Sequence, residues 1–331
     1  MRTSLLASFL LLAAACGDNG DTNTVDARPR PDGRPPSVDA DPNAPDADPS
    51  APDAPAGTPD APAGNPDAPP TSGPSPLIIS EVRNNGAEEF VEIYNPNAAA
   101  VDLRNYYLSD APSFWMLPGH PTTPIVLDAS DFLERFPAGA SIPAGGVITI
   151  AMNGPGFTTR YAADPTYSTD ELAGTTVAME TTVMSGGANP NPGITNGGEV
   201  VILFYWDGAS DRVQDVDIVL AGPAATSAAN RLPAAGMNYR MAVDGPDADA
   251  VATAYAPDAL TLQPMAAALV DADPLFPSYK RLTRDGAASE VQTGGNGIAG
   301  NDETSEQQLM TWDGGTTAGT PGAVPTTLST P

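Results

Sequence analysis

The sequence of 331 residues contains one cysteine, one histidine and one lysine, and each scarcity excludes a class of chemistry. Cys16 alone cannot form a disulfide within the chain. His120 stands between a glycine and a proline in an expected loop, so a surface residue is the simpler interpretation than a base or a ligand. Ser-His-Asp and Cys-His sites need a histidine held near a nucleophile, and zinc sites need several nitrogen or sulfur ligands, so these sites are not expected. Neither a P-loop nor a dinucleotide fingerprint is present.

Positive charge is also scarce. The formal net charge is −27, and Lys280 is the only lysine. Phosphate binding requires clustered lysine and arginine, so we expect no nucleic-acid partner. An acidic, solvated surface that keeps an exported protein soluble explains the charge most simply, and attraction of divalent cations is the alternative.

The first fifteen residues have the pattern of a signal peptide. Arg2 precedes an apolar run from Leu5 to Leu12, and three alanines precede Cys16. The segment resembles a bacterial lipoprotein signal, with Ala13 where leucine is usual. That resemblance implies a lipidated Cys16 and an exported, outer-membrane lipoprotein of the cell envelope, anchored by its acyl chains. An ordinary secretory signal cleaved near Ala15 is the alternative.

Residues 16–76 are predicted to be a disordered tether. They are rich in Pro, Asp and Ala, and a seven-residue period begins at Pro45, Pro52, Pro59 and Pro66. Such a segment buries too little apolar surface to offset its chain entropy. Prolines and mutually repelling aspartates favour an extended spacer that holds the following domain away from the membrane.

Short strands dominate the rest of the chain. Residues 77–82 and 90–94 flank an Asn-Asn-Gly turn and predict a hairpin, with Val91 and Ile93 on one face, and a third strand is expected over 101–108. Further strands are predicted over 141–152, 199–206, 212–219 and 278–283. Short helices are expected within two insertions, at 128–136, 247–255 and 258–270, and the region 153–196 is expected to be mostly loop.

The ordered set of motifs resembles a known family. The motifs are IISEV, EFVEIYNP, VDLRNYYLSD, SIPAGGVITIAM, NGGEVVILFYWDG, SYKRL and AGTPGAVP. They are similar to the lamin-tail domain of nuclear lamins and of many secreted bacterial proteins. The resemblance implies a mainly β, immunoglobulin-like β-sandwich over residues 77–325, followed by a tail at 326–331.

Carboxylates are the remaining candidates for chemistry. Glu81, Glu89 and Glu92 lie on adjacent predicted strands and could converge as glycoside hydrolysis requires, but acidic residues recur at these places in non-catalytic members of the family. We therefore predict no catalytic residue, and a structural ion pair from Glu92 to Arg104 or Arg281. We predict no metal or other cofactor, with calcium as the alternative. Its ligands would be Asp207, Asp211, Asp302 and Glu306, for which turn chemistry is the simpler role.

These features together predict a non-enzymatic surface lipoprotein that displays a binding or adhesion domain. Its partners would be the membrane, through Cys16, and a protein or polysaccharide at the cell surface. A metal-assisted hydrolase that uses carboxylates and a purely structural envelope component are the alternatives. A pocket holding three of Asp207, Asp211, Asp244, Asp302 and Glu306 would favour the hydrolase, and an exposed aromatic patch near Trp115 or Tyr106 would favour adhesion, although Trp115 is more simply a core residue.

Overall fold

The computed structural model describes residues 73–120, 122–123, 125, 127, 130–169, 176–182, 192–222, 242–256, 269 and 276–328. The chain divides into two compact units, Met1–Gly64 and Asn65–Pro331, and every described residue belongs to the second. The predicted signal peptide, Cys16, residues 16–72 of the tether and most of the helix expected at 258–270 lie outside the described residues. Within them, no helix is long and apolar enough to cross a membrane.

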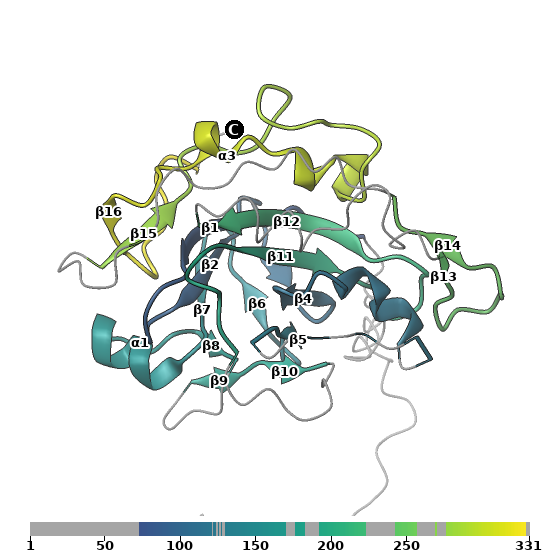
Figure 1. Ribbon diagram of the computed structural model, residues 1–331, viewed down its shortest axis with the longest axis horizontal. Coiled ribbons are helices and arrows are strands. Elements are labelled where there is room, and N and C mark those ends of the chain that lie inside the picture. The colour runs from purple at the N-terminus through teal and green to yellow at the C-terminus, as the bar shows by residue number, and fades with distance from the viewer. Residues whose placement is uncertain are drawn as a thin grey trace, which may run out of the picture. The chain divides into compact units, whose positions relative to one another are not determined.

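The described residues form a mainly β fold (Figure 1), as predicted. The long strands are β1 (Ile78–Arg83), β2 (Phe90–Tyr94), β4 (Tyr106–Ser109), β7 (Val147–Ala151), β11 (Glu199–Tyr205), β12 (Gln214–Ala221) and β15 (Pro277–Lys280). The shorter strands are β3 (Val101–Asp102), β5 (Leu133–Arg135), β6 (Ser141–Ile142), β8 (Tyr167–Ser168), β9 (Val177–Ala178), β10 (Glu180–Thr181), β13 (Ala242–Val243), β14 (Thr253–Ala254) and β16 (Thr317–Ala318). Helical turns are few: η1 (Phe114–Gly119), α1 (Gly154–Tyr161), η3 (Ile298–Gly300), η4 (Glu303–Ser305) and α3 (Gln308–Thr311).

The first sheet has the strand order β16-β15-β1-β2-β7-β8-β9. Its centre is the predicted hairpin, in which β1 and β2 pair antiparallel across a turn where Gly86 adopts a φ of 85°. That angle suits glycine, which lacks the Cβ that makes positive φ unfavourable. On the other side of β1 lies β15, from near the C-terminus, so the sheet joins both ends of the domain.

The second sheet has the order β10-β5-β4-β11-β12, with every pair antiparallel. The predicted hairpin over residues 199–219 is confirmed as β11 and β12, joined by a turn that begins at Asp207 and Gly208. All seven residues of β11 are buried, because the strand is covered on both faces.

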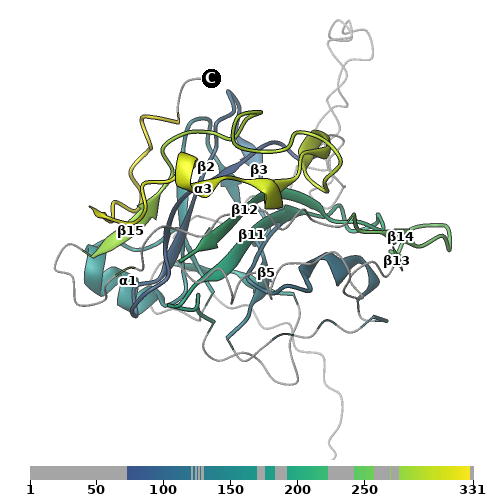
Figure 2. The same cartoon turned by 45° about the horizontal axis from the view of Figure 1, so that its top comes forward.

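The two sheets pack face to face around one apolar core, as a sandwich requires. Alternate residues of each sheet point into it, including the predicted Val91 and Ile93 of β2 and Val201 and Leu203 of β11. A second cluster covers the outer face of the second sheet, where η1 and β13 pack (Figure 2). Fully burying such side chains stabilises the fold by about 1.5–3 kcal/mol each.

Three local predictions were wrong. The expected strand over 101–108 is divided into β3 and β4, which pair with different partners. The helix expected at 128–136 is instead strand β5, because Phe132 and Leu133 face opposite cores. The helix expected at 247–255 is absent, and its end forms β14.

Helix α1 also forms where a loop was expected. Its N-cap is Asn153, whose Oδ1 accepts a hydrogen bond of 2.8 Å from Gly156 N, and Pro155 occupies its first turn. Both are favourable helix-start signals. Phe157 packs edge-on against Phe90, so the helix covers the outer face of the first sheet.

Candidate functional site

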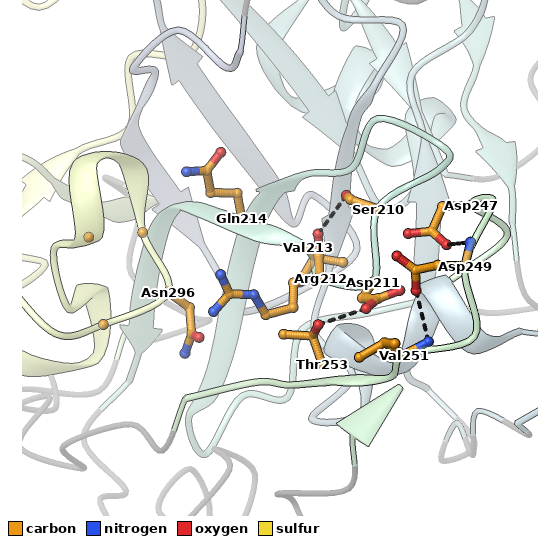
Figure 3. A pocket seen from close by; sticks show the side chains of 13 residues that line it. Ser210, Asp211, Arg212, Val213, Gln214, Asp247, Asp249, Val251, Thr253 and Asn296 are labelled. Atoms are coloured by element: carbon orange, nitrogen blue, oxygen red, sulfur yellow. Dashed lines mark hydrogen bonds between the residues drawn. The ribbon is translucent and has the colours of Figure 1, made fainter. Parts of the chain in front are cut away.

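An open groove lies where the turn between β11 and β12 meets two loops from later in the chain (Figure 3). Its volume is about 630 Å³. The strand side contributes residues from Ser210 to Gln214, the loop before β14 contributes aspartates, and the loop around Asn296 contributes glycines. The lining residues are Ser210, Asp211, Arg212, Val213, Gln214, Asp247, Asp249, Val251, Thr253, Gly295, Asn296, Gly297 and Gly300.

The groove presents both hydrogen-bond donors and acceptors. Figure 3 shows Arg212 lying between Asn296 on one side and Asp211 with Thr253 on the other. Asp211 is held by hydrogen bonds from Gly245 N, at 2.9 Å, and Thr253 Oγ1, at 2.7 Å. These bonds lower the pKa of Asp211, so its carboxylate remains ionised and fixed in position.

Two loop aspartates shape the opposite wall. Asp247 Oδ1 accepts from Asp249 N at 3.0 Å, and Asp249 Oδ1 accepts from Val251 N at 2.8 Å. Such side-chain bonds to the backbone two residues ahead stabilise turns. The sequence signal for this wall is the run Asp244-Gly-Pro-Asp-Ala-Asp, part of which lies within the helix expected at 247–255.

The structure does not bring the four alternative calcium ligands together. Asp207 Oδ1 accepts from Ala209 N and Ser210 N and thereby caps the turn after β11. Asp211 lines the groove, and Asp302 accepts from Thr304 N and Oγ1 to cap η4. Glu306 contacts Arg281. The groove therefore contains only Asp211 of the five residues proposed for a hydrolytic pocket.

Arg281 is the centre of a buried acidic cluster. Its guanidinium is fully buried, and it pairs with Asp217 at 3.0 Å, with Glu306 at 3.2 Å, and with Asp285. Asp217 also accepts a bond of 2.7 Å from Ile79 N, so the cluster ties β12 of one sheet to β1 of the other. Although burial opposes its charge, the carboxylates raise the pKa of Arg281 above its usual value.

Glu81 and Glu92 face each other across β1 and β2, as predicted for converging carboxylates. Glu81 accepts from Ser278 Oγ at 2.5 Å and from Thr320 N at 2.8 Å. Glu92 accepts from Ser80 Oγ at 2.8 Å and from Gly322 N at 2.6 Å. The two carboxylates thus hold residues 313–328, named here the closing segment, over the first sheet.

The ion pair predicted for Glu92 is wrong. Its hydrogen-bond partners are Ser80 and Gly322, whereas Arg104 pairs with its near neighbour Asp102 at 2.6 Å, and Arg281 belongs to the cluster above. Burial, with the nearby charge of Glu81, raises the pKa of Glu92 to about 7. Glu89 lies apart from this pair and accepts from Ile194 N at 3.0 Å.

The aromatic patch proposed for adhesion is also absent from the places suggested. Trp115 is buried and stacks on Tyr255, with ring centroids 5.7 Å apart, which confirms the prediction that it is a core residue. Tyr106 is buried too, and its hydroxyl donates to Ser75 O at 2.9 Å. His120 is half-buried at the end of η1, where its backbone N–H donates to Leu117 O.

Comparison with known proteins identifies the domain but no activity. No curated protein matches the chain. The crystal structure of a DUF4876 family protein from Bacteroides thetaiotaomicron VPI-5482 is similar, with 15% sequence identity and a TM-score of 0.43 over 76% of this chain and 75% of that one. The Lamin Tail Domain family matches residues 70–219, which end within β12, while β15 and β16 complete the first sheet from outside the match. Residues 70–219 of this chain are therefore a lamin-tail domain.

Proposed function

We propose that this chain is a non-enzymatic, membrane-anchored surface lipoprotein whose lamin-tail domain binds a polysaccharide in the groove beside Arg212. The mixed lining of the groove is the observation that carries the proposal. Sugar hydroxyls both donate and accept hydrogen bonds, and the groove offers carboxylate acceptors together with guanidinium and amide donors. Three carboxylates in one groove disfavour a polyanionic ligand.

The lowered pKa of Asp211, in the groove, favours binding over catalysis. A general acid needs a raised pKa so that it holds a proton near neutral pH. The pKa of Asp211 is lowered instead, by hydrogen bonds from Gly245 and Thr253. Glu81 and Glu92, which do have raised pKa values, lie beneath the closing segment and accept its N–H groups.

Membrane anchoring rests on the sequence, where small residues precede Cys16 and an acidic, proline-rich segment follows it. Lipid chains at Cys16 would hold the protein on the membrane, and the spacer would carry the groove outward. Replacing Cys16 by Ser should move the protein from the membrane fraction to the soluble fraction. Membrane association of Cys16→Ser equal to that of the wild type would disprove the anchor.

Co-sedimentation with insoluble polysaccharides tests binding by the groove. We expect the full-length chain to bind at least one of cellulose, chitin or peptidoglycan, and Arg212→Ala and Gln214→Ala, which change two lining side chains, to bind at least about tenfold more weakly, a loss of about 1.4 kcal/mol. Arg104→Ala is the matched control, because Arg104 lies on the surface in a local pair with Asp102. Equal binding by all variants would exclude the groove as the site.

Metal-assisted hydrolysis remains the alternative, and one observation favours it. Asp211, Asp244 and Asp247 each offer an oxygen within 4.8 Å of the others at the edge of the groove. Incubating the protein with the same polysaccharides, with and without added divalent cations, decides between the two. Release of soluble sugars that Asp211→Asn abolishes would replace the binding proposal by an enzymatic one.

A further inference from the structure

A cavity of about 380 Å³ lies between the closing segment and the first sheet, and it shares no lining residue with the groove beside Arg212. Its sheet side contains Glu81 of β1, Glu92 of β2 and Lys280 of β15. Glu81 lies opposite Glu92 on one neighbouring strand and opposite Lys280 on the other. Residues opposite each other in antiparallel strands point to the same face of the sheet. Two carboxylates and one ammonium group therefore form a row across three strands, under the closing segment.

The two carboxylates are held in place and can still accept further hydrogen bonds. The carboxylate of Glu81 accepts three hydrogen bonds from the chain, and that of Glu92 accepts two. An ionised carboxylate has about four acceptor positions. Each glutamate therefore keeps at least one position for a donor from a ligand, while its present bonds fix its orientation.

The lining of the cavity carries more negative than positive charge. Asp313 lines it together with the two glutamates, and its cationic residues are Lys280 and Arg281. The charge of Arg281 is already matched by the three carboxylates with which it pairs. Within the described part of the chain, Lys280 forms no ion pair, so one ammonium group remains against three carboxylates. This balance favours a cationic ligand.

The opening of the cavity is apolar. Leu282, just after β15, and Val324, in the closing segment, line the cavity and are 43% and 47% exposed. Leu282 N donates to Thr311 O at 2.6 Å, so α3 lies beside this opening, and Leu309 and Met310 of α3 are exposed as well. Large apolar side chains that gather at the surface around polar groups are typical of an interaction site.

A basic side chain matches both the apolar opening and the acidic floor, because lysine and arginine carry a cationic head on an apolar stem. We propose that this cavity binds a lysine or arginine side chain of a protein partner, with the stem against Leu282 and Val324 and the head at Glu81 and Glu92. A second copy of this chain is a poor partner, since a net charge of −27 makes two copies repel each other. A neutral sugar gains nothing from the charge of the cavity.

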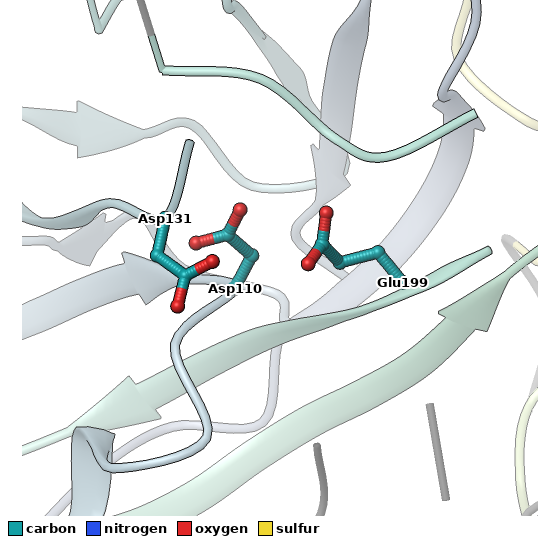
Figure 4. Close-up of side chains that lie close together, drawn as sticks. All are labelled: Asp110, Asp131 and Glu199. Carbon is teal, nitrogen blue, oxygen red and sulfur yellow. The ribbon is translucent and has the colours of Figure 1, made fainter. Parts of the chain in front are cut away.

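Two other buried acidic groups lack this combination of charge and apolar opening. Asp110, Asp131 and Glu199 converge at the end of β4 (Figure 4), but they line neither of the two cavities. The carboxylates around Arg281 already have a cation among them. The row of Glu81 and Glu92 therefore offers the better site for a cationic side chain from outside.

Calorimetric titration of the full-length chain with the peptide acetyl-GLKLG-amide tests the proposal. The titration is made at pH 8, where Glu92 is ionised, because burial and the nearby charge of Glu81 raise its pKa to about 7. Salt at about 0.15 M screens attraction between distant charges. We expect a dissociation constant below about 1 mM. The same peptide with norleucine or glutamate in place of lysine should bind at least about tenfold more weakly, because it lacks the cationic head.

Two variants change the cavity itself. Glu92→Gln should bind the lysine peptide at least about tenfold more weakly, because it removes a charge from the floor. Leu282→Ser should bind it at least about threefold more weakly, because it removes part of the apolar opening. Leu282 is nearly half exposed, so this variant tests the cavity even if Glu92→Gln does not fold.

Two matched controls make the same changes elsewhere. Glu180→Gln removes one negative charge from an exposed position on β10, and Val177→Ser shortens an apolar side chain that is 49% exposed on β9. Both should bind the lysine peptide as the wild type does. The proposal is overturned if the wild type does not bind this peptide, or if the controls lose as much affinity as the cavity variants, which would assign binding to the negative charge of the whole chain.

Discussion

The described residues contain two largely buried acidic triads whose oxygens have different surroundings. Around Arg281, the carboxylates of Asp217, Asp285 and Glu306 have an internal cation. At the end of β4, Asp110, Asp131 and Glu199 converge with Asp110 Oδ2 unpaired. The contrast teaches that a buried carboxylate can be compensated by a cation of the same chain or can keep one oxygen that accepts no hydrogen bond. The pair Glu81 and Glu92 shows a third way, in which neutral donors from the closing segment satisfy the oxygens.

Removing the guanidinium of Arg281 should have the largest effect on the free energy of unfolding. Arg281→Met leaves Asp217 and Glu306 buried without their partner, and breaking such a pair typically costs about 3–5 kcal/mol. Urea unfolding at pH 7 measures the loss. A variant as stable as the wild type would show that the cluster contributes nothing to the fold.

The raised pKa of Glu92, whose oxygens accept from neutral donors, should make the free energy of unfolding depend on pH. Burial raises the pKa of Glu92 from 4.5 to about 7, so the folded protein holds a proton that the unfolded chain releases. The stabilising contribution is complete below about pH 4.5 and is lost as the pH rises through 7. Each pKa unit corresponds to about 1.4 kcal/mol, so up to about 3 kcal/mol is involved.

Glu92→Gln should therefore flatten the fall in stability between pH 5 and pH 8, measured by urea unfolding in EDTA. Glu180→Gln is the control, because Glu180 is exposed at the edge of the second sheet. An unchanged slope in Glu92→Gln would assign the pH dependence to other carboxylates.

Removing one neutral hydrogen-bond donor should lower the free energy of unfolding by a smaller amount. Ser278→Ala removes the hydroxyl that donates to Glu81 at 2.5 Å, while Thr320 N and Oγ1 remain. Loss of one hydrogen bond to a carboxylate should cost about 1.5–3 kcal/mol. Thermal unfolding at pH 7 gives the value, and a loss above that for Arg281→Met would reverse the order proposed here.

The smallest effect should come from the exposed pair. Arg104 and Asp102 lie 2.6 Å apart with side chains 29% and 46% exposed, and such surface pairs contribute about 0–1 kcal/mol. Arg104→Met should shift the urea midpoint little. A large loss would mean that burial is not what separates the two kinds of ion pair.

Local patterns predicted much of the fold, and only some of the site. The hairpins were predictable because alternation and an Asn-Asn-Gly or Asp-Gly turn act between neighbours in the sequence. Strand β5 was not, since Phe132 and Leu133 face different cores that exist only after the sheets pack. The role of Asp207 as a turn cap was predictable from the sequence, because its side chain bonds to residues two and three positions ahead.

The carboxylate triads could not be found from spacing. Asp110, Asp131 and Glu199 meet only through the pairing of three strands, and Arg281 reaches Asp217 from 64 residues away. A usable signal did exist, since each member of the first triad stands at or near the end or beginning of a strand. Recognising it required the strand order, which a single sequence does not state.

The position of β15 beside β1 also affects the order in which the domain can fold. The carboxylate of Glu81 meets Ser278 and Thr320, which follow it by 197 and 239 residues. Until those residues are available, β1 has an unpaired edge, and closing so long a loop is slow. A chain synthesised or translocated from its N-terminus would therefore keep its first sheet incomplete until Ser278 and Thr320 had emerged, and removal of β15 would expose an edge prone to aggregation.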